Sequence, residues 1–189
     1  MTLPPPTHGA GVGDLPIPPD DKDWTWTLRE QCPECGFLAA EVAPWDVAPL
    51  VLAFTQPWPA VLARADAGRR PAPSTWSALE YACHVRDVCR LFEQRLQLVL
   101  TQDAPTFANW DQDETAVADR HGEQDPTTVA GELTAAGASF AAAYAALPSD
   151  AWGRTGIRLD GAQFTVPTLG QYGLHDLRHH LRDVGVDPL

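Results

Sequence analysis

The sequence has few cations, and this scarcity limits what the protein can bind. It contains one lysine, Lys22, and twelve arginines against 25 acidic residues, so the net charge is −12. A strongly acidic chain repels nucleic acid phosphates and anionic lipid headgroups. We therefore expect no nucleic acid partner and no attachment to a membrane.

Long apolar runs and export signals are also missing. No stretch of about 18 uninterrupted apolar residues occurs, so no membrane-spanning helix is expected. Residues 1–19 lack a basic start and an apolar centre and contain six prolines, which excludes a secretory signal and favours an extended or disordered tail over residues 1–22. Four cysteines without an export signal indicate a cytoplasmic protein, because disulfides are rare in a reducing compartment.

Apolar spacing predicts two helices in the first half of the chain. Apolar residues make up 44% of the sequence, enough for the core of one domain. Residues 46–67 form an apolar stretch that favours a helix, although Pro57 and Pro59 would kink or interrupt it. A second helix is expected from residue 78 to about residue 100, because Ser77 and Glu80 form a capping box before a helical apolar pattern.

The second half predicts two more helices. The third is expected to open at Asp125, which precedes a proline at the first helical position, and to end before Pro148. The fourth should begin at a capping box formed by Thr168 and Gln171 and run to about Val184. Four helices around one core predict a bundle.

Two short segments outside these helices have β character. Residues 154–166 predict a β-hairpin with Asp160–Gly161 in a two-residue turn, and residues 24–28 alternate as a short strand would. We therefore expect an all-α four-helix bundle over residues 44–185 with a small β-hairpin, preceded by an irregular extension over residues 23–43.

Three of the six histidines lie close together in the fourth predicted helix. His175 and His179 are four residues apart and share a helix face, the arrangement by which one helix supplies two imidazoles to one ion. His180 points about 100° away from them. The face of His175 and His179 lies nearly opposite the apolar stripe, so it is either solvated or lines a groove between helices.

His84 is the candidate for a third ligand. It lies in the second predicted helix at the shoulder of the apolar stripe. A histidine there is either a buried side chain satisfied by hydrogen bonds or a metal ligand. Glu80, one turn earlier, could also bind an ion, but the capping box already accounts for it.

These residues carry a resemblance to a known family. The stretches WSALEYACHVRDV (residues 76–88) and YGLHDLRHHLRDV (residues 172–184) resemble the DinB superfamily, which includes mycothiol-dependent maleylpyruvate isomerases and related bacterial thiol transferases. The similarity spans roughly residues 44–185. It implies a metal-binding bundle with mycothiol as thiol cosubstrate. The ligands that it implies are His84, His175 and His179, with His180 packed beside them or in contact with a ligand.

The chemistry of three imidazoles agrees with this resemblance. Three neutral imidazoles leave a divalent ion with open coordination positions, as in catalytic sites. Such an ion lowers the pKa of a bound water or thiol, and the thiolate is the nucleophile. Zinc, nickel, iron and manganese all suit these ligands, so the sequence does not identify the metal.

Several polar side chains are candidates for a role around the ion. Acidic groups near the histidines could orient the imidazoles, and an acidic loop could reach a polar substrate, although surface salt bridges and a solvated loop are the plainer readings. Tyr172 could reach a substrate or simply pack. The acidic candidates are Asp87, Asp176 and Asp183 near the histidines, and Asp111, Asp113 and Glu114 in the loop.

Cys32 and Cys35 lie in CPECGF (residues 32–37), which has the spacing and the glycine of half a zinc knuckle. A structural zinc site needs four ligands, so two more would have to come from elsewhere. The alternatives are inert thiols in a turn and a redox pair, although a thioredoxin-like βαβ context is missing.

These observations predict a divalent-metal-dependent enzyme, a thiol S-transferase or isomerase of the mycothiol type that acts on a small molecule. A metal-dependent hydrolase and a non-catalytic metal-binding stress-response module are the alternatives. A pocket beside the ion would distinguish an enzyme from a module. The seven tryptophans could fill the core or cover a homodimer surface, which leaves the oligomeric state open.

Overall fold

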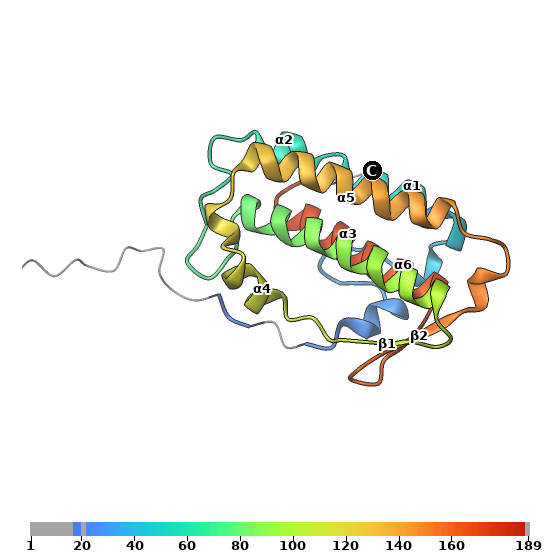
Figure 1. Cartoon of the computed structure of the whole chain (residues 1–189). Helices are drawn as coiled ribbons and strands as arrows, with labels where there is room; N and C mark the ends of the chain where they lie inside the picture. Colours follow the sequence, from blue (N-terminus) through green and yellow to red (C-terminus); the bar gives the residue numbers. More distant parts are fainter. Residues whose placement is uncertain (1–16, 20–21, 188–189) are drawn as a thin grey trace, which may run out of the picture.

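Four helical rods surround one core (Figure 1). The computed structural model describes residues 17–19 and 22–187, so the tail expected over residues 1–22 lies almost wholly outside the described residues. The first rod consists of α1 (Val47–Thr55) and α2 (Trp58–Leu62), and the others are α3 (Ala78–Thr101), α5 (Pro126–Ala145) and α6 (Val166–Asp183). Both α1 and α3 pack against α5 and α6. The predicted four-helix bundle is therefore confirmed.

The beginnings of the helices follow local side-chain chemistry. The Ser77 hydroxyl accepts a hydrogen bond from the Glu80 N–H, and the Glu80 carboxylate accepts one from the Ser77 N–H, so the predicted capping box opens α3. α5 begins after the predicted cap, Asp125. The break between α1 and α2 falls at Pro57, as expected, because a proline removes a backbone donor.

The start of α6 differs from the prediction. Thr165, not Thr168, is the N-cap, and its capping partner is Thr168. Gln171 instead donates its side-chain hydrogen bond to the Val42 carbonyl at 2.9 Å, which ties α6 to the segment before α1. Thr165 offers the same hydroxyl and backbone groups as Thr168, three residues earlier, so the helix begins there. Gly185 follows the helix with φ of +71°, which suits the predicted stop.

A small sheet covers one end of the bundle. β2 (Thr155–Arg158) and β3 (Gln163–Thr165) form the predicted antiparallel hairpin, and β1 (Thr106–Phe107) adds a parallel edge strand that the sequence pattern did not indicate. The turn is longer than the two predicted residues, since it connects Arg158 to Gln163. Gly161, with φ of +94°, provides its left-handed conformation.

Residues 24–28 form a 3-10 helix, so the predicted strand is wrong. The Asp23 carboxylate accepts hydrogen bonds from the N–H and the hydroxyl of Thr25, and the Thr27 hydroxyl donates to the Trp24 carbonyl. These local bonds favour a turn over a strand, whose backbone groups would need a partner. In the described part of the chain, no helix combines the length and apolar character needed to cross a bilayer.

Candidate metal centre

One group of side chains with metal-ligand chemistry lies between α3 and α6. Nε2 of His84 is 3.0 Å from Oδ1 of Asp176, and Nε2 of His180 is 3.1 Å from the same oxygen. All three ligand atoms lie within 4.8 Å of one another. Asp176 and His180 are four residues apart on α6, so they share a face, and His84 approaches them from α3. We call these residues the His–Asp–His cluster.

The surroundings of this cluster fix its imidazoles. Nδ1 of His180 lies 2.8 Å from the Asp183 carboxylate, one turn further along α6. The ring of His84 is fully buried and stacks on Trp110 with centroids 5.3 Å apart and planes 7° apart. Its Nδ1 has no hydrogen-bond partner among the described residues. The two rings are therefore held in place from both helices.

Charge is distributed unevenly within the His–Asp–His cluster. Burial lowers the pKa of His84, which leaves a neutral imidazole. Burial also opposes a charge on His180, but its hydrogen bonds to Asp176 and Asp183 raise its pKa to about 9. Although burial disfavours the carboxylate, His84 and His180 hold the pKa of Asp176 well below its usual range. The cluster thus keeps an anion whose nearest charge partner is a cation.

A second group joins the N-terminal extension to the neighbouring face of α6. The ligand atoms of Cys32, Cys35, His175 and His179 lie within 4.8 Å of one another. Cys32 is fully buried, and Cys35 and His175 are nearly so. Burial raises the pKa of Cys35 to about 11 and lowers that of His175 to about 4. We call these residues the Cys–His cluster.

The predicted ligands are divided between the two clusters. His175 and His179 belong to the Cys–His cluster, whereas His84 belongs to the His–Asp–His cluster. The helical-wheel argument correctly separated His180 from His175 and His179, but it is the face of His180 that meets His84, with ring centroids 4.8 Å apart. Of the two readings left open for this face, a solvated surface and a groove between helices, the burial of His175 favours the groove.

A pocket of about 580 Å³ opens beside both clusters. Asp176 and His180 lie on its wall, as do His175 and His179. The acidic loop contributes Asp111, Asp113 and Glu114, where Asp111 also caps α4 (Gln112–Ala118) by accepting a hydrogen bond from the Glu114 N–H. The predicted loop residues thus meet His175 and His179 around one cavity, whose size is that of small-molecule sites.

Two arginines and a tyrosine, none of them predicted as ligands, add donors to this pocket. Arg158 donates to Asp160 and lies 3.4 Å from the Tyr172 hydroxyl. Arg95 is buried, which lowers its pKa to about 10, and donates to the Ala108 carbonyl. Tyr172 also packs on Phe92, so its plainer role in packing holds together with its place on the wall. Arg95 is visible in the sequence only as a polar interruption of an apolar stripe.

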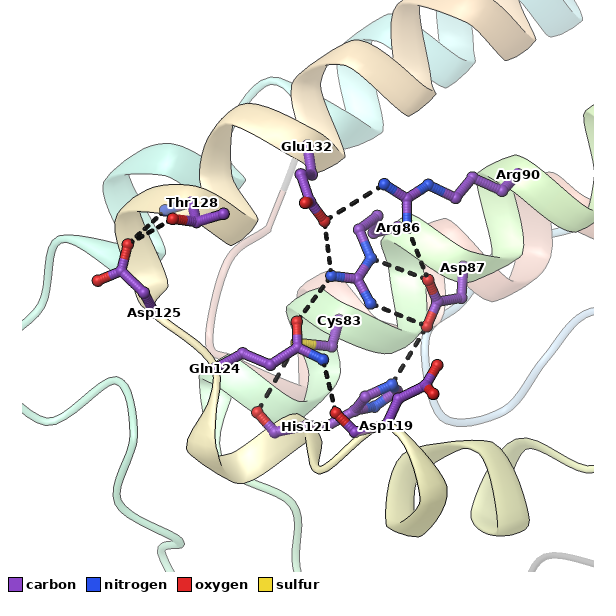
Figure 2. Close-up of polar contacts among 10 residues, drawn as sticks. All are labelled: Cys83, Arg86, Asp87, Arg90, Asp119, His121, Gln124, Asp125, Thr128 and Glu132. Atoms are coloured by element: carbon purple, nitrogen blue, oxygen red, sulfur yellow. Dashed lines mark hydrogen bonds and ion pairs between the residues drawn. The ribbon is translucent and has the colours of Figure 1, made fainter.

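Asp87 belongs to a salt-bridge network and not to the His–Asp–His cluster, so the structure shows the plainer of the two readings that the sequence left open. Its carboxylate lies 2.8 Å from Arg86 and 3.2 Å from His121, and both contacts are drawn in Figure 2. Arg86 also donates to Glu132 on α5, so the network connects α3 to α5. Three positions after His84 correspond to a rotation of about 60° around the helix axis. Asp87 therefore lies to one side of His84 on α3, where it meets His121.

Comparison with known proteins gives a consistent fold. A family model of the DinB superfamily matches residues 55–184. The structure resembles that of YfiT from Bacillus subtilis, described as "a probable metal-dependent hydrolase with an unusual four-helix bundle topology", with a TM-score of 0.62 and 17% sequence identity over 78% of this chain and 92% of that chain. Among curated proteins, none matches the sequence.

Proposed function

Because this chain belongs to the DinB superfamily, we propose that it is a divalent-metal-dependent enzyme whose ion is held by His84, Asp176 and His180. The observation that carries this proposal is the convergence of two imidazole nitrogens on one carboxylate oxygen at the wall of a pocket. Two imidazoles and a carboxylate are a common ligand set for catalytic metals, and they leave coordination positions open.

The donor set fits a cation. Three carboxylates, those of Asp176, Asp183 and Glu34, lie close to the histidines of α6 and favour a positive charge among them. A bound divalent ion would lower the pKa of a thiol or a water molecule that binds to it. Asp183 would orient His180 through Nδ1, as a carboxylate behind a metal-binding histidine commonly does.

The pocket wall supports a polar small molecule as substrate. It carries guanidinium groups from Arg95 and Arg158, a phenol from Tyr172, and carboxylates from the acidic loop. Such a wall can bind hydroxyl and charged groups together, which suits a sugar-bearing thiol of the mycothiol type. We therefore favour a thiol S-transferase or isomerase, in which His84 and His180 hold the ion and the arginines position the cosubstrate.

Hydrolysis is the second candidate. The similar structure is described as a metal-dependent hydrolase, and a ligand set of two histidines and a carboxylate also occurs in metal-dependent hydrolases. In that case water would take the place of the thiol. A non-catalytic module is less well supported, because the pocket beside Asp176 and His180 is of a size that small-molecule sites have.

Assays of the full-length protein distinguish these functions. The protein is loaded separately with zinc, nickel, iron and manganese, then incubated with mycothiol, glutathione or cysteine and a panel of electrophiles, and in parallel with esters and amides without a thiol. We expect metal-dependent, saturable thiol conjugation, lost in His84→Gln and retained in the control His121→Gln. Thiol-independent cleavage would establish the hydrolase, and no metal-dependent turnover of either kind would contradict the enzyme and favour the module.

A second comparison tests the ligand assignment. Asp176→Asn and His180→Gln should lose the metal that turnover requires, whereas Cys32→Ser should retain it. If instead His175→Ala and His179→Ala abolish binding of that metal while Asp176→Asn binds it normally, the ion lies with His84, His175 and His179, as the family resemblance implied.

A further inference from the structure

The cysteines of the N-terminal extension and two histidines of α6 form a group that the proposed reaction does not use. We propose that Cys32, Cys35, His175 and His179 bind a zinc ion that fastens the N-terminal extension to α6. This site shares no ligand with the His–Asp–His cluster, so it stands or falls independently of the proposed function.

The geometry suits tetrahedral zinc. In a tetrahedral site with bond lengths of about 2.0–2.3 Å, the ligand atoms lie roughly 3.3–3.8 Å apart. The four ligand atoms here already lie within 4.8 Å of one another, and Sγ of Cys32 is 3.7 Å from Nδ1 of His179. Small side-chain rotations are sufficient to close the remaining gap.

The backbone around the cysteines has the form of a zinc knuckle. The Gly36 N–H donates to the Cys32 carbonyl at 2.8 Å, and the Cys32 N–H donates to the Phe37 carbonyl at 2.9 Å. Gly36 has φ of +71°, a conformation that glycine adopts readily. Both sulfurs therefore point to the same side of a tight turn. The two cysteines are not joined by a disulfide.

The histidines are arranged to complete this site. Nε2 of His175 is buried and has no hydrogen-bond partner among the described residues. Nδ1 of His179 faces Cys32, while its Nε2 lies 3.7 Å from the Glu34 carboxylate and 3.9 Å from that of Asp183. A carboxylate behind the distal nitrogen is the usual partner of a metal-binding imidazole.

Charge and burial favour a closed, structural site. Two thiolates and two neutral imidazoles balance the charge of a divalent cation, so the filled site has no net charge to bury. Trp24 covers it, with its ring 5.7 Å from that of His175 and 5.5 Å from that of His179. Figure 1 shows the extension in blue running beside the bundle, and its 3-10 helix contacts α6. A sulfur-rich set of four ligands selects zinc over metals that prefer oxygen.

Cobalt substitution tests the proposal directly, because thiolate ligands give intense charge-transfer absorption in the near ultraviolet that oxygen and nitrogen ligands do not. We expect the full-length protein to purify with about one equivalent of tightly held zinc, and the cobalt form to show the thiolate band. Cys32→Ser and Cys35→Ser should lose the band and this zinc, whereas Cys83→Ser, which alters a buried cysteine that lies against His121 and Gln124, should keep both.

A second measurement avoids dependence on variants that could fail to fold. Zinc should protect Cys32 and Cys35 from alkylation, and a chelator should expose them at least about tenfold faster, as mass spectrometry of the peptides would show. A cobalt form without a thiolate band would overturn the proposal, as would a disulfide between the two cysteines in protein purified with reductant. The His–Asp–His cluster contains no sulfur, so its loss would leave these readouts unchanged.

Discussion

α6 presents two neighbouring pairs of side chains to two different partners. Asp176 and His180 face His84 on α3, whereas His175 and His179 face Cys32 and Cys35 in the N-terminal extension. The pairs are offset by one residue, which on a helix is a rotation of about 100°. One helix therefore supplies two of the three residues of the His–Asp–His cluster and two of the four residues of the Cys–His cluster.

The two clusters differ in what holds them together. His84 and its partners lie on helices that begin at capping boxes and pack through the core. The cysteines lie on a turn of the N-terminal extension, outside the helices and strands. The packing of the helices therefore brings the His–Asp–His cluster together, whereas an ion in the Cys–His cluster would itself help to hold the N-terminal extension on α6. We expect a metal ion to support turnover in the His–Asp–His cluster and to raise the stability of the fold in the Cys–His cluster.

The largest effect is expected from Asp176→Asn. The substitution removes the shared carboxylate charge while keeping the size of the side chain, so turnover should fall by at least about 100-fold, the upper range for loss of groups that support a metal. Steady-state kinetics with the preferred metal measures it. The thiolate–cobalt band should persist. Its loss together with activity would show that the two clusters are one site.

Removal of zinc from the Cys–His cluster should lower the stability of the folded protein. An ion present at about 100 times its Kd stabilises the folded state by about 2.7 kcal/mol, which corresponds to a fall in Tm of roughly 5–11 °C on removal. The measurement is thermal unfolding of Asp176→Asn protein with and without chelator. This variant is used because its His–Asp–His cluster should hold no metal and so should not contribute to the difference. The same fall in protein that also carries Cys32→Ser would contradict the assignment.

Asp183→Asn should have a smaller effect, on activity. Asp183 accepts a hydrogen bond from Nδ1 of His180 and so fixes the orientation of that ring. Its amide would orient the ring less well, and metal affinity or turnover should fall about tenfold, the lower range for such partners. Asp187→Asn is the matched control, because Asp187 pairs with Arg178 at the exposed end of the chain. Equal losses in both variants would point to a general charge effect.

The sequence predicted most of the bundle because its helix starts are local. Ser77 with Glu80, and Asp125 with the proline after it, fix the beginnings of α3 and α5 through side chains within one turn. The predictions for residues 24–28 and for the start of α6 were wrong because two local patterns competed there. In the first the patterns are a strand and a turn, and in the second they are two threonine caps. The three-residue shift at Thr165 shows that equivalent hydroxyls cannot be ranked without the strand that precedes them.

The site could be predicted only in part, because it depends on how α6 is rotated. Residues 175 and 179 and residues 176 and 180 are both pairs four apart, so spacing alone allows either to meet His84. Packing decides between them, and it directs Asp176 and His180 toward α3. The partners of Cys32 and Cys35 are equally long-range, since they lie on the last helix of the chain.

Glu80→Gln should have the smallest effect. It changes stability at the start of α3 and leaves the Cys–His cluster unchanged. Glu80 bonds to Ser77 and Arg70 at the start of α3, one turn before His84. Glutamine keeps a capping oxygen but loses the charge, so stability should fall by about 1 kcal/mol, or roughly 2–4 °C in Tm. The thiolate–cobalt band should not change, because the Cys–His cluster contains no residue of α3.

The pH dependence of this effect identifies the charge as its cause. Burial opposes ionisation of Glu80, but Arg70 and Ser77 lower its pKa. A lowered carboxyl pKa stabilises the fold above the unfolded value of about 4.3, and this stabilisation is lost as the pH falls through the folded value. The difference in Tm between the wild type and Glu80→Gln should therefore be constant from about pH 6 to 8 and shrink below about pH 4. Glu123→Gln, in an exposed pair with Arg120, should show no such window. A difference that persists at low pH would place the effect in packing and leave the start of α3 uncoupled from its charge.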